Sequence, residues 1–286
     1  MKKEIKEYDS ETLAKLQELE LEILKDFNHI CDKYDIDYFA CGGTCIGVAR
    51  HHGFIPWDDD IDVGLSRKDM LKFYKVAEKE FPGKYTLLNA DTDPNYYCMN
   101  TKWMLNGTEF REYGNEYYPR NLGIFLDMFC FDNVPDDDKL MRKQGFWAWF
   151  WGKLLILRNV SKPTLYVYGI KAKIVTLMSM IIHFFLVLFH VSPRFLYKKA
   201  QKHARMYDNA ETKRMAFLFD PQPYTSMVVK KTVYPTVKRK YDTTIMRSPC
   251  KMHAYLSRRY GDYMKLPPVE KRHNHLPYKL DFGNYQ

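Results

Sequence analysis

The chain has 286 residues, of which 46% are hydrophobic and 16% aromatic, so it has enough apolar material for a large core and is not a disordered protein. Lys and Arg outnumber Asp and Glu by 44 to 35, giving a formal net charge of +9 that suits a phosphate-bearing partner or an anionic membrane surface. The six cysteines form no CxxC pair and the first residues lack the apolar core of a signal peptide, which predicts a cytoplasmic protein with reduced thiols.

The first predicted element is an amphipathic packing helix over residues 10–34, because apolar residues recur there at helical spacing and acidic residues occupy the first turn. A short strand over 37–41 follows and ends at Gly42-Gly43, and residues 44–52 resemble a short helix closed by Gly53. Cys41 and Cys45 could form half of a zinc site, but no second Cys/His pair with suitable spacing follows. The alternative for these two cysteines is a pair of small buried residues.

The next stretch, GFIPWDDDIDVGLS over residues 53–66, places four aspartates beside residues that favour burial. Asp60 and Asp62 alternate with Ile61 and Val63, so on a strand the two carboxylates share one face while the apolar residues point into the core. Two carboxylates at such a short separation repel each other unless a cation lies between them. The alternative is a solvated acidic turn, but the apolar neighbours favour a buried Mg²⁺ or Mn²⁺ site.

Two further features fit the plan of a nucleotidyltransferase. The Gly42-Gly43-Thr44 turn could bring backbone amides at a helix N-terminus close to phosphates. A third acid, Asp127, lies between apolar residues in IFLDMF, although an isolated charged residue at a strand end is its alternative. With further strands expected at KYTLLN, YYCMNTKWML and GIFLDMFCFD, the pattern predicts an α/β (α+β) fold with a mixed nucleotidyltransferase-like sheet.

The character of the chain changes after Asp136. Two strongly apolar runs appear there, and the second, Ile174 to Val191, has 18 residues without a Lys, Arg, Asp or Glu. A helix of that length reaches roughly 27 Å, the lower limit for crossing a bilayer. A buried helix and a helix in the plane of the membrane fit as well, and the basic flanks lead us to expect peripheral contact with a membrane. We therefore divide the chain into an N-terminal packing helix (1–36), a catalytic core (37–135), an apolar and basic helical region (136–200) and a C-terminal region (201–286).

Three segments carry a resemblance to a known family: CGGTCIGVARHHGFIPWDDDIDVGLSRKD, GIFLDMFCFDNVP and YGDYMKLPPVEKR. They closely resemble the LicD family of phosphotransferases, which is similar to the fukutin-type glycan-modifying enzymes. The resemblance covers nearly the whole chain beyond Asp37, and GFIPWDDDID is its most specific part. Its implications for the site are expectations about particular residues of this sequence.

The resemblance implies that Gly42, Gly43 and Thr44 hold the donor phosphates. It implies a metal site of four acids: Asp58, Asp60, Asp62 and Asp127. Asp127 would also act as general base on the acceptor hydroxyl. Arg50 would neutralise charge that develops in the reaction, with a surface ion pair as its alternative. Further candidate contacts to phosphate or substrate are Arg67, Lys102, His273 and His275.

The implied function is transfer of phosphocholine, or a similar phospho-alcohol, from CDP-choline or another CDP-alcohol donor to a cell-surface glycan such as teichoic acid or lipopolysaccharide. The glycan would be lipid-linked, and the enzyme would act in the cytoplasm at the inner face of the membrane. A ribitol-phosphate, glycerol-phosphate or phospho-sugar transferase is the alternative on the same fold. A nucleic-acid-binding protein is a distant alternative, since the acidic cluster would repel a phosphate backbone, and the three acids argue against an inactive scaffold.

Overall fold

The structure is a computed structural model that describes residues 8–112, 118–163, 169–221, 224–269, 272 and 274–285. Eight α-helices are found in these ranges: α1 (Ser10–Lys33), α2 (Gly42–Arg50), α3 (Arg67–Glu80), α4 (Asp138–Asn159), α5 (Gly169–Leu188), α6 (Pro193–Ala204), α7 (Lys230–Val233) and α8 (Met252–Tyr260). The strands of the same ranges are β1 (Tyr38–Ala40), β2 (Asp62–Ser66), β3 (Tyr85–Leu88), β4 (Thr101–Leu105), β5 (Glu109–Glu112), β6 (Phe125–Val134), β7 (Arg214–Ala216), β8 (Val228–Val229), β9 (Val237–Tyr241), β10 (Thr244–Ser248) and β11 (Pro277–Asp281).

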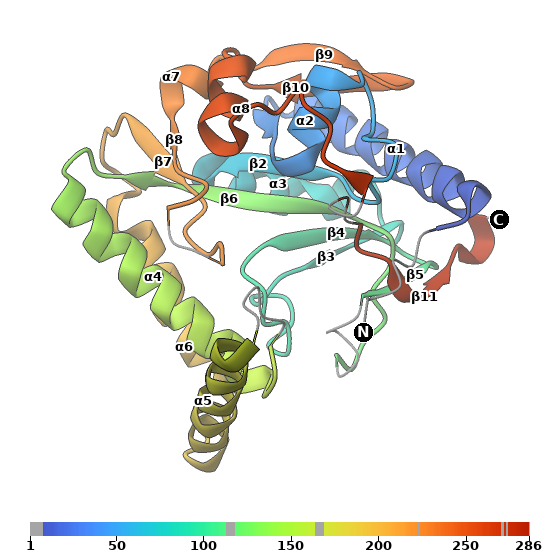
Figure 1. Cartoon of the computed structure of the whole chain (residues 1–286). Coiled ribbons are helices and arrows are strands. Elements are labelled where there is room, and N and C mark those ends of the chain that lie inside the picture. The colour runs from blue at the N-terminus through green and yellow to red at the C-terminus, as the bar shows by residue number, and fades with distance from the viewer. Residues whose placement is uncertain are drawn as a thin grey trace.

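The centre of the molecule is a mixed seven-stranded sheet in which β1, β2, β6, β4 and β3 lie side by side and β7 and β8 extend it from β6. β2 and β6 run parallel, whereas β1, β4 and β7 run antiparallel to their neighbours. Helices α2 and α8 lie above β2 and β6 in Figure 1, with the β9–β10 hairpin beside them. The predicted α/β fold with a mixed sheet is confirmed.

Local sequence signals explain where the elements around the site begin. The Asp9 carboxylate accepts a hydrogen bond from the Thr12 amide and so caps α1, and Ser66 caps α3 by accepting one from the Asp69 amide. The predicted packing helix over residues 10–34 is therefore confirmed. The expected strand over 96–105 begins only at Thr101, because residues 96–100 form a loop.

The main core lies between the sheet and helices α1 and α3. Phe27 from α1, Phe73 from α3 and Trp103 from β4 pack against one another through tilted and edge-on ring contacts. All three side chains are buried, together with most of the apolar stripe of α1. The rigid packing beneath β2 and β6 fixes the two strands that carry the predicted acids. The division into four segments ending at residues 36, 135 and 200 stays a prediction.

Helices α4 and α6 pack along each other, and α5 projects away from the rest of the protein (Figure 1). α5 contains most of the apolar run predicted from the sequence, and only 6% of its apolar window is buried. It is the one helix in the described ranges that is long and apolar enough to cross a membrane. The alternative of a helix buried within the protein is therefore wrong, since the apolar side chains of α5 face outwards.

Candidate functional site

The predicted acids meet where β2 begins beside β6. Asp62 and Asp127 are partners in the parallel ladder between these strands, so their side chains lie on the same face of the sheet. Asp58 and Asp60 precede β2, and both interact electrostatically with Asp62. The structure thus brings together all four acids that the sequence singled out.

The Gly42-Gly43 turn closes over these acids at the start of α2. Gly42 has a φ of +57°, and a Cβ atom there would lie 2.3 Å from Asp62 Oδ2. A Cβ atom on Gly43 would lie 3.0 Å from Asp58 Oδ2. Because only glycine lacks this atom, the turn admits the carboxylates to the N-terminus of the helix. The Thr44 hydroxyl accepts a 2.8 Å hydrogen bond from the Asp62 amide and so fixes α2 to β2.

The negative charges crowd one another strongly. Burial raises the pKa of Asp58 to about 8, and the neighbouring Asp60 and Asp59 add to that effect. Burial, followed by Asp60 and Asp127, raises the pKa of Asp62 well above its usual range. Neither carboxylate accepts a hydrogen bond from any of the described residues. A bound cation would relieve this repulsion, as would protonation.

Asp127 is held from the β4 side of the sheet. The Asn100 amide donates a 2.7 Å hydrogen bond to its Oδ1, and Lys102 Nζ donates one of 3.2 Å to its Oδ2. Burial raises the pKa of Asp127 to about 6, although Lys102 opposes that shift. Burial disfavours the charged amine of Lys102, but Asp127 and Glu112 outweigh it and raise the pKa of Lys102. The positive charge therefore lies directly beside Asp127.

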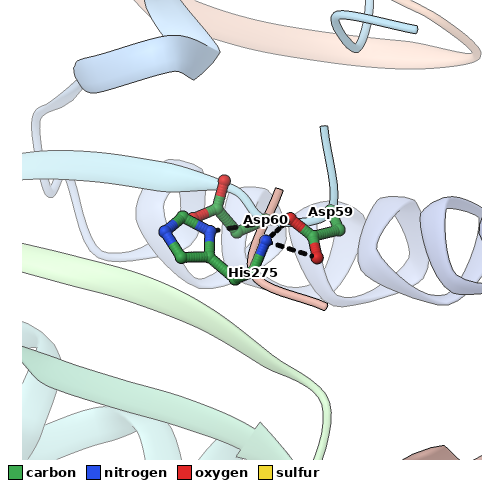
Figure 2. A group of neighbouring side chains, drawn as sticks. All are labelled: Asp59, Asp60 and His275. Carbon is green, nitrogen blue, oxygen red and sulfur yellow. Dashed lines mark hydrogen bonds and ion pairs between the residues drawn. The ribbon is translucent and has the colours of Figure 1, made fainter. Parts of the chain in front are cut away.

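His275 brings a second positive charge to the acids from the C-terminal part of the chain. Figure 2 shows its ring directed towards Asp60, with Nδ1 3.3 Å from Oδ2, while its backbone amide donates to both oxygens of Asp59. Hydrogen bonds with Asp59 and Asp60 raise the pKa of His275 to about 12. The Tyr8 hydroxyl also donates to Asp59, at 2.8 Å.

Potential ligand atoms of Asp59, Asp60 and His275 lie within 4.8 Å of one another, so these residues could also hold a metal ion. We favour an ion pair here, because both oxygens of the fully buried Asp59 already accept hydrogen bonds. Asp59 was missed from the sequence. Its signal was that the middle residue of three consecutive aspartates on an extended chain faces away from the other two.

Glu20 of α1 was also missed. Its side chain is 2% exposed, and its Oε2 has no hydrogen-bond partner among the described residues. Burial, followed by Asp60, Asp59 and Asp58, raises its pKa well above the usual range. The signal was present in the sequence, because Glu20 interrupts the apolar stripe between Leu16 and Ile23.

Two predicted phosphate contacts are engaged elsewhere. Arg67 directly follows β2, and its guanidinium makes two 2.8 Å hydrogen bonds to Asp132 of β6. At about 3.3 Å per strand residue, Arg67 is roughly 15 Å along the chain from Asp62. Arg50 donates to the carbonyls of Tyr263 and Lys265 and so holds the C-terminal segment. The structure therefore does not bring either arginine to the four acids. His273 lies outside the described residues.

The four acids lie within a stretch of the chain that matches a known family model. Residues 35–153 match the family model described as LicD/FKTN/FKRP, nucleotidyltransferase domain. The chain is 29% identical to the lipopolysaccharide cholinephosphotransferase LicD of Haemophilus influenzae, over 92% of this chain and 96% of that protein. It is also 36% identical to an uncharacterised protein of Rickettsia typhi, over 55 residues that make up 19% of this chain and 18% of that protein. Residues 35–153 are thus similar to the nucleotidyltransferase domain of the LicD family, and similarity to a LicD cholinephosphotransferase extends along nearly the whole chain.

Proposed function

We propose that this enzyme transfers phosphocholine, or a similar phospho-alcohol, from CDP-choline or another CDP-alcohol to a cell-surface glycan. The observation that carries the proposal is the pairing of Asp62 and Asp127 on adjacent parallel strands, opposite the Gly42-Gly43 turn. The Haemophilus influenzae relative, which is named for acting on lipopolysaccharide, supports a choline donor and a glycan acceptor, with teichoic acid as another acceptor of the same class.

The residues present fit a divalent cation. Asp58 and Asp62 offer carboxylates that accept no hydrogen bond from the described residues, and Gly42 and Gly43 leave room beside them. Oxygen ligands of this kind suit Mg²⁺ or Mn²⁺. We propose Asp58, Asp60, Asp62 and Asp127 as the residues that would hold it. When bound, the ion would neutralise charge on the donor diphosphate and on the departing CMP.

The protein's own groups would position the two substrates. Backbone amides at the start of α2, from Gly43 and Thr44, would face the donor phosphates, as the partial positive charge of a helix N-terminus favours. Asp127 has a pKa of about 6, so it is ionised at neutral pH and could accept the proton of the acceptor hydroxyl. Asn100 and Lys102 fix its orientation for that role. Lys102 and His275 would balance negative charge around the reacting phosphate.

The exposed apolar helix supports the proposal that the enzyme works at the inner face of a membrane on a lipid-linked glycan. Ile181, Phe184 and Phe185 of α5 are about half exposed, whereas Ser179 is buried against the rest of the protein. His183 Nδ1 lies 2.8 Å from the Leu157 carbonyl oxygen of α4, which ties the two helices together. Basic residues flank the apolar run, as anionic lipid surfaces favour. We propose peripheral association through this helix.

A panel of donors tests the proposed activity. Purified protein would be incubated with Mg²⁺, a lipopolysaccharide acceptor and CDP-choline, CDP-ribitol, CDP-glycerol or a nucleotide sugar, and CMP release would be measured. We expect release with CDP-choline that depends on both the metal and the acceptor. Release with CDP-ribitol or CDP-glycerol alone would reassign the donor, and no release with any CDP-alcohol would contradict the proposal.

A further inference from the structure

We propose that a cavity between α3, α6 and the loop before β4 binds a phosphate-bearing sugar of the acceptor. This inference deepens the proposed function and depends on it for the identity of the acceptor. The cavity has a volume of about 420 Å³, within the usual range for small-molecule sites. Its lining carries four basic side chains, Arg67, Lys198, Lys202 and Arg205, against the single carboxylate of Asp91.

The charge available for a ligand comes from α6. Arg67 is engaged with Asp132 and Arg205 with Asp208, whereas Lys198 and Lys202 form no ion pair with a described carboxylate. Because the two lysines are four residues apart, they lie on the same face of the helix. An adjacent face, with Leu196, Ala200 and Ala204, is buried. The helix therefore presents to the cavity two ammonium groups that no described carboxylate neutralises, and these are suitable partners for phosphate oxygens.

Gln201 indicates that the ligand also carries hydroxyl groups. It lies on the same face of α6 and lines the cavity, and its buried Oε1 accepts no hydrogen bond from the described residues. Buried side-chain oxygens of this kind almost always accept a hydrogen bond in folded proteins. Inorganic phosphate at neutral pH offers only one or two P–OH donors, which its contacts with the lysines would have to orient towards Gln201. A sugar phosphate offers hydroxyl donors beside its phosphate and matches both features.

The cavity reaches the proposed catalytic acid only around the edge of the sheet. Asn100 lines the cavity and also donates to Asp127. Cys130 lines it three residues after Asp127, about 10 Å along β6, and the alternation of side chains puts Cys130 on the face of the sheet opposite to Asp127. β4 pairs with β6 only as far as Met128, and β7 pairs with β6 only from Asp132 onwards. Residues 129–131 of β6 therefore pair with neither β4 nor β7. An acceptor held by α6 could therefore extend past this strand edge to Asp127.

The position of α6 also fits an acceptor that is linked to a lipid. α6 begins at Pro193, shortly after the exposed apolar helix α5 ends at Leu188. A membrane that received α5 would bring the lysines of α6 close to the level of the headgroups. The phosphate could belong to the acceptor sugar or to a lipid headgroup, and we assign it to the acceptor sugar because of Gln201.

Calorimetry with soluble probes tests the assignment without requiring transfer activity. Glucose 6-phosphate, inorganic phosphate and glucose would be titrated into the full chain in the absence of divalent metal. We expect glucose 6-phosphate to bind most tightly, and Lys198→Gln/Lys202→Gln to weaken it about tenfold, as the loss of a charge-assisted hydrogen bond implies. Gln201→Leu should remove the preference for glucose 6-phosphate over phosphate. The control pair, Lys75→Gln/Lys79→Gln, has the same spacing on α3 outside the cavity and should bind like the wild type.

A vesicle assay separates the two sources of phosphate. Phosphatidylcholine vesicles with and without phosphatidic acid would be mixed with the wild type and the Lys198→Gln/Lys202→Gln variant. We expect both proteins to bind the acidic vesicles, because α5 carries the main contact, with the variant weakened only by the loss of two basic charges near the surface. Loss of vesicle binding with unchanged binding of glucose 6-phosphate would assign the cavity to a lipid headgroup and overturn the inference, as would a wild type that does not bind glucose 6-phosphate. Sugar-phosphate binding at the lysines together with no CMP release from any donor would overturn the proposed function alone.

Discussion

Replacing Arg67 with Met should destabilise the protein without impairing the use of the donor. Asp132 is fully buried, Arg67 is 14% exposed, and two hydrogen bonds of 2.8 Å join them. Removing one partner of a buried, hydrogen-bonded ion pair costs about 3–5 kcal/mol, because it leaves the other charge without compensation. With a urea m-value of about 3 kcal/mol/M, the midpoint of unfolding should fall by roughly 1–1.7 M.

The assay is urea unfolding of the Arg67→Met, Asp132→Leu and double variants, together with the KM of the wild type and Arg67→Met for CDP-choline. We expect the double variant to be more stable than Arg67→Met, because it buries no unpaired charge. The donor KM of Arg67→Met should equal that of the wild type at temperatures where both are folded. An unchanged unfolding midpoint with a clearly raised donor KM would refute the reasoning and restore Arg67 as a phosphate ligand.

Three further predictions follow from the acids and from α5. A carboxyl whose folded-state pKa is raised keeps a proton that the unfolded chain loses above its ordinary pKa of 4.5, so the contribution of Glu20 to stability falls as the pH rises. In EDTA, the free energy of unfolding should therefore fall less steeply from pH 5 to 8 for Glu20→Gln than for the wild type. The two slopes should differ by up to about 1.4 kcal/mol per pH unit, and identical slopes would contradict the buried acid. Ile181→Glu/Phe185→Glu should reduce binding to anionic vesicles at least about tenfold in a flotation assay, since charge is costly in the apolar layer, and unchanged flotation would exclude α5 as the contact. Asp127→Asn should still bind CDP-choline in calorimetry but lose transfer by about a hundredfold or more, whereas a wild-type rate would make Asp127 structural.

The sequence was most informative where neighbouring residues decide the structure. Alternation around Asp62 and the apolar flanks of Asp127 predict two buried strands, and strands that carry acids at matching positions can place them side by side. The Gly42-Gly43 turn was predicted for the same reason, because glycine is needed where backbone and side chains approach closely. The caps of α1 and α3 are likewise set by residues within three positions.

The sequence was least informative where a partner comes from far along the chain. Arg67 pairs with a residue 65 positions away, and Arg50 holds a carbonyl 213 positions away. His275 meets Asp59 across 216 positions, through a loop with no regular periodicity. A basic residue close to an acidic motif looks like a phosphate ligand in the sequence, but tertiary packing assigns it another partner. Glu20 differs, because an acid on an apolar helix face is visible before the fold is known.

The most direct test of the account is transfer from labelled CDP-choline to lipopolysaccharide by Asp62→Asn, measured with Mg²⁺ binding to the same protein. A matched control is Asp35→Asn, since Asp35 is exposed and asparagine tolerates its positive φ of 47°. We predict that Asp62→Asn folds but loses both Mg²⁺ binding and at least about a hundredfold in transfer, or roughly 3 kcal/mol of transition-state stabilisation. Asp35→Asn should keep both. Near-normal transfer by Asp62→Asn would contradict the assignment of these acids to the metal site and to phosphotransfer.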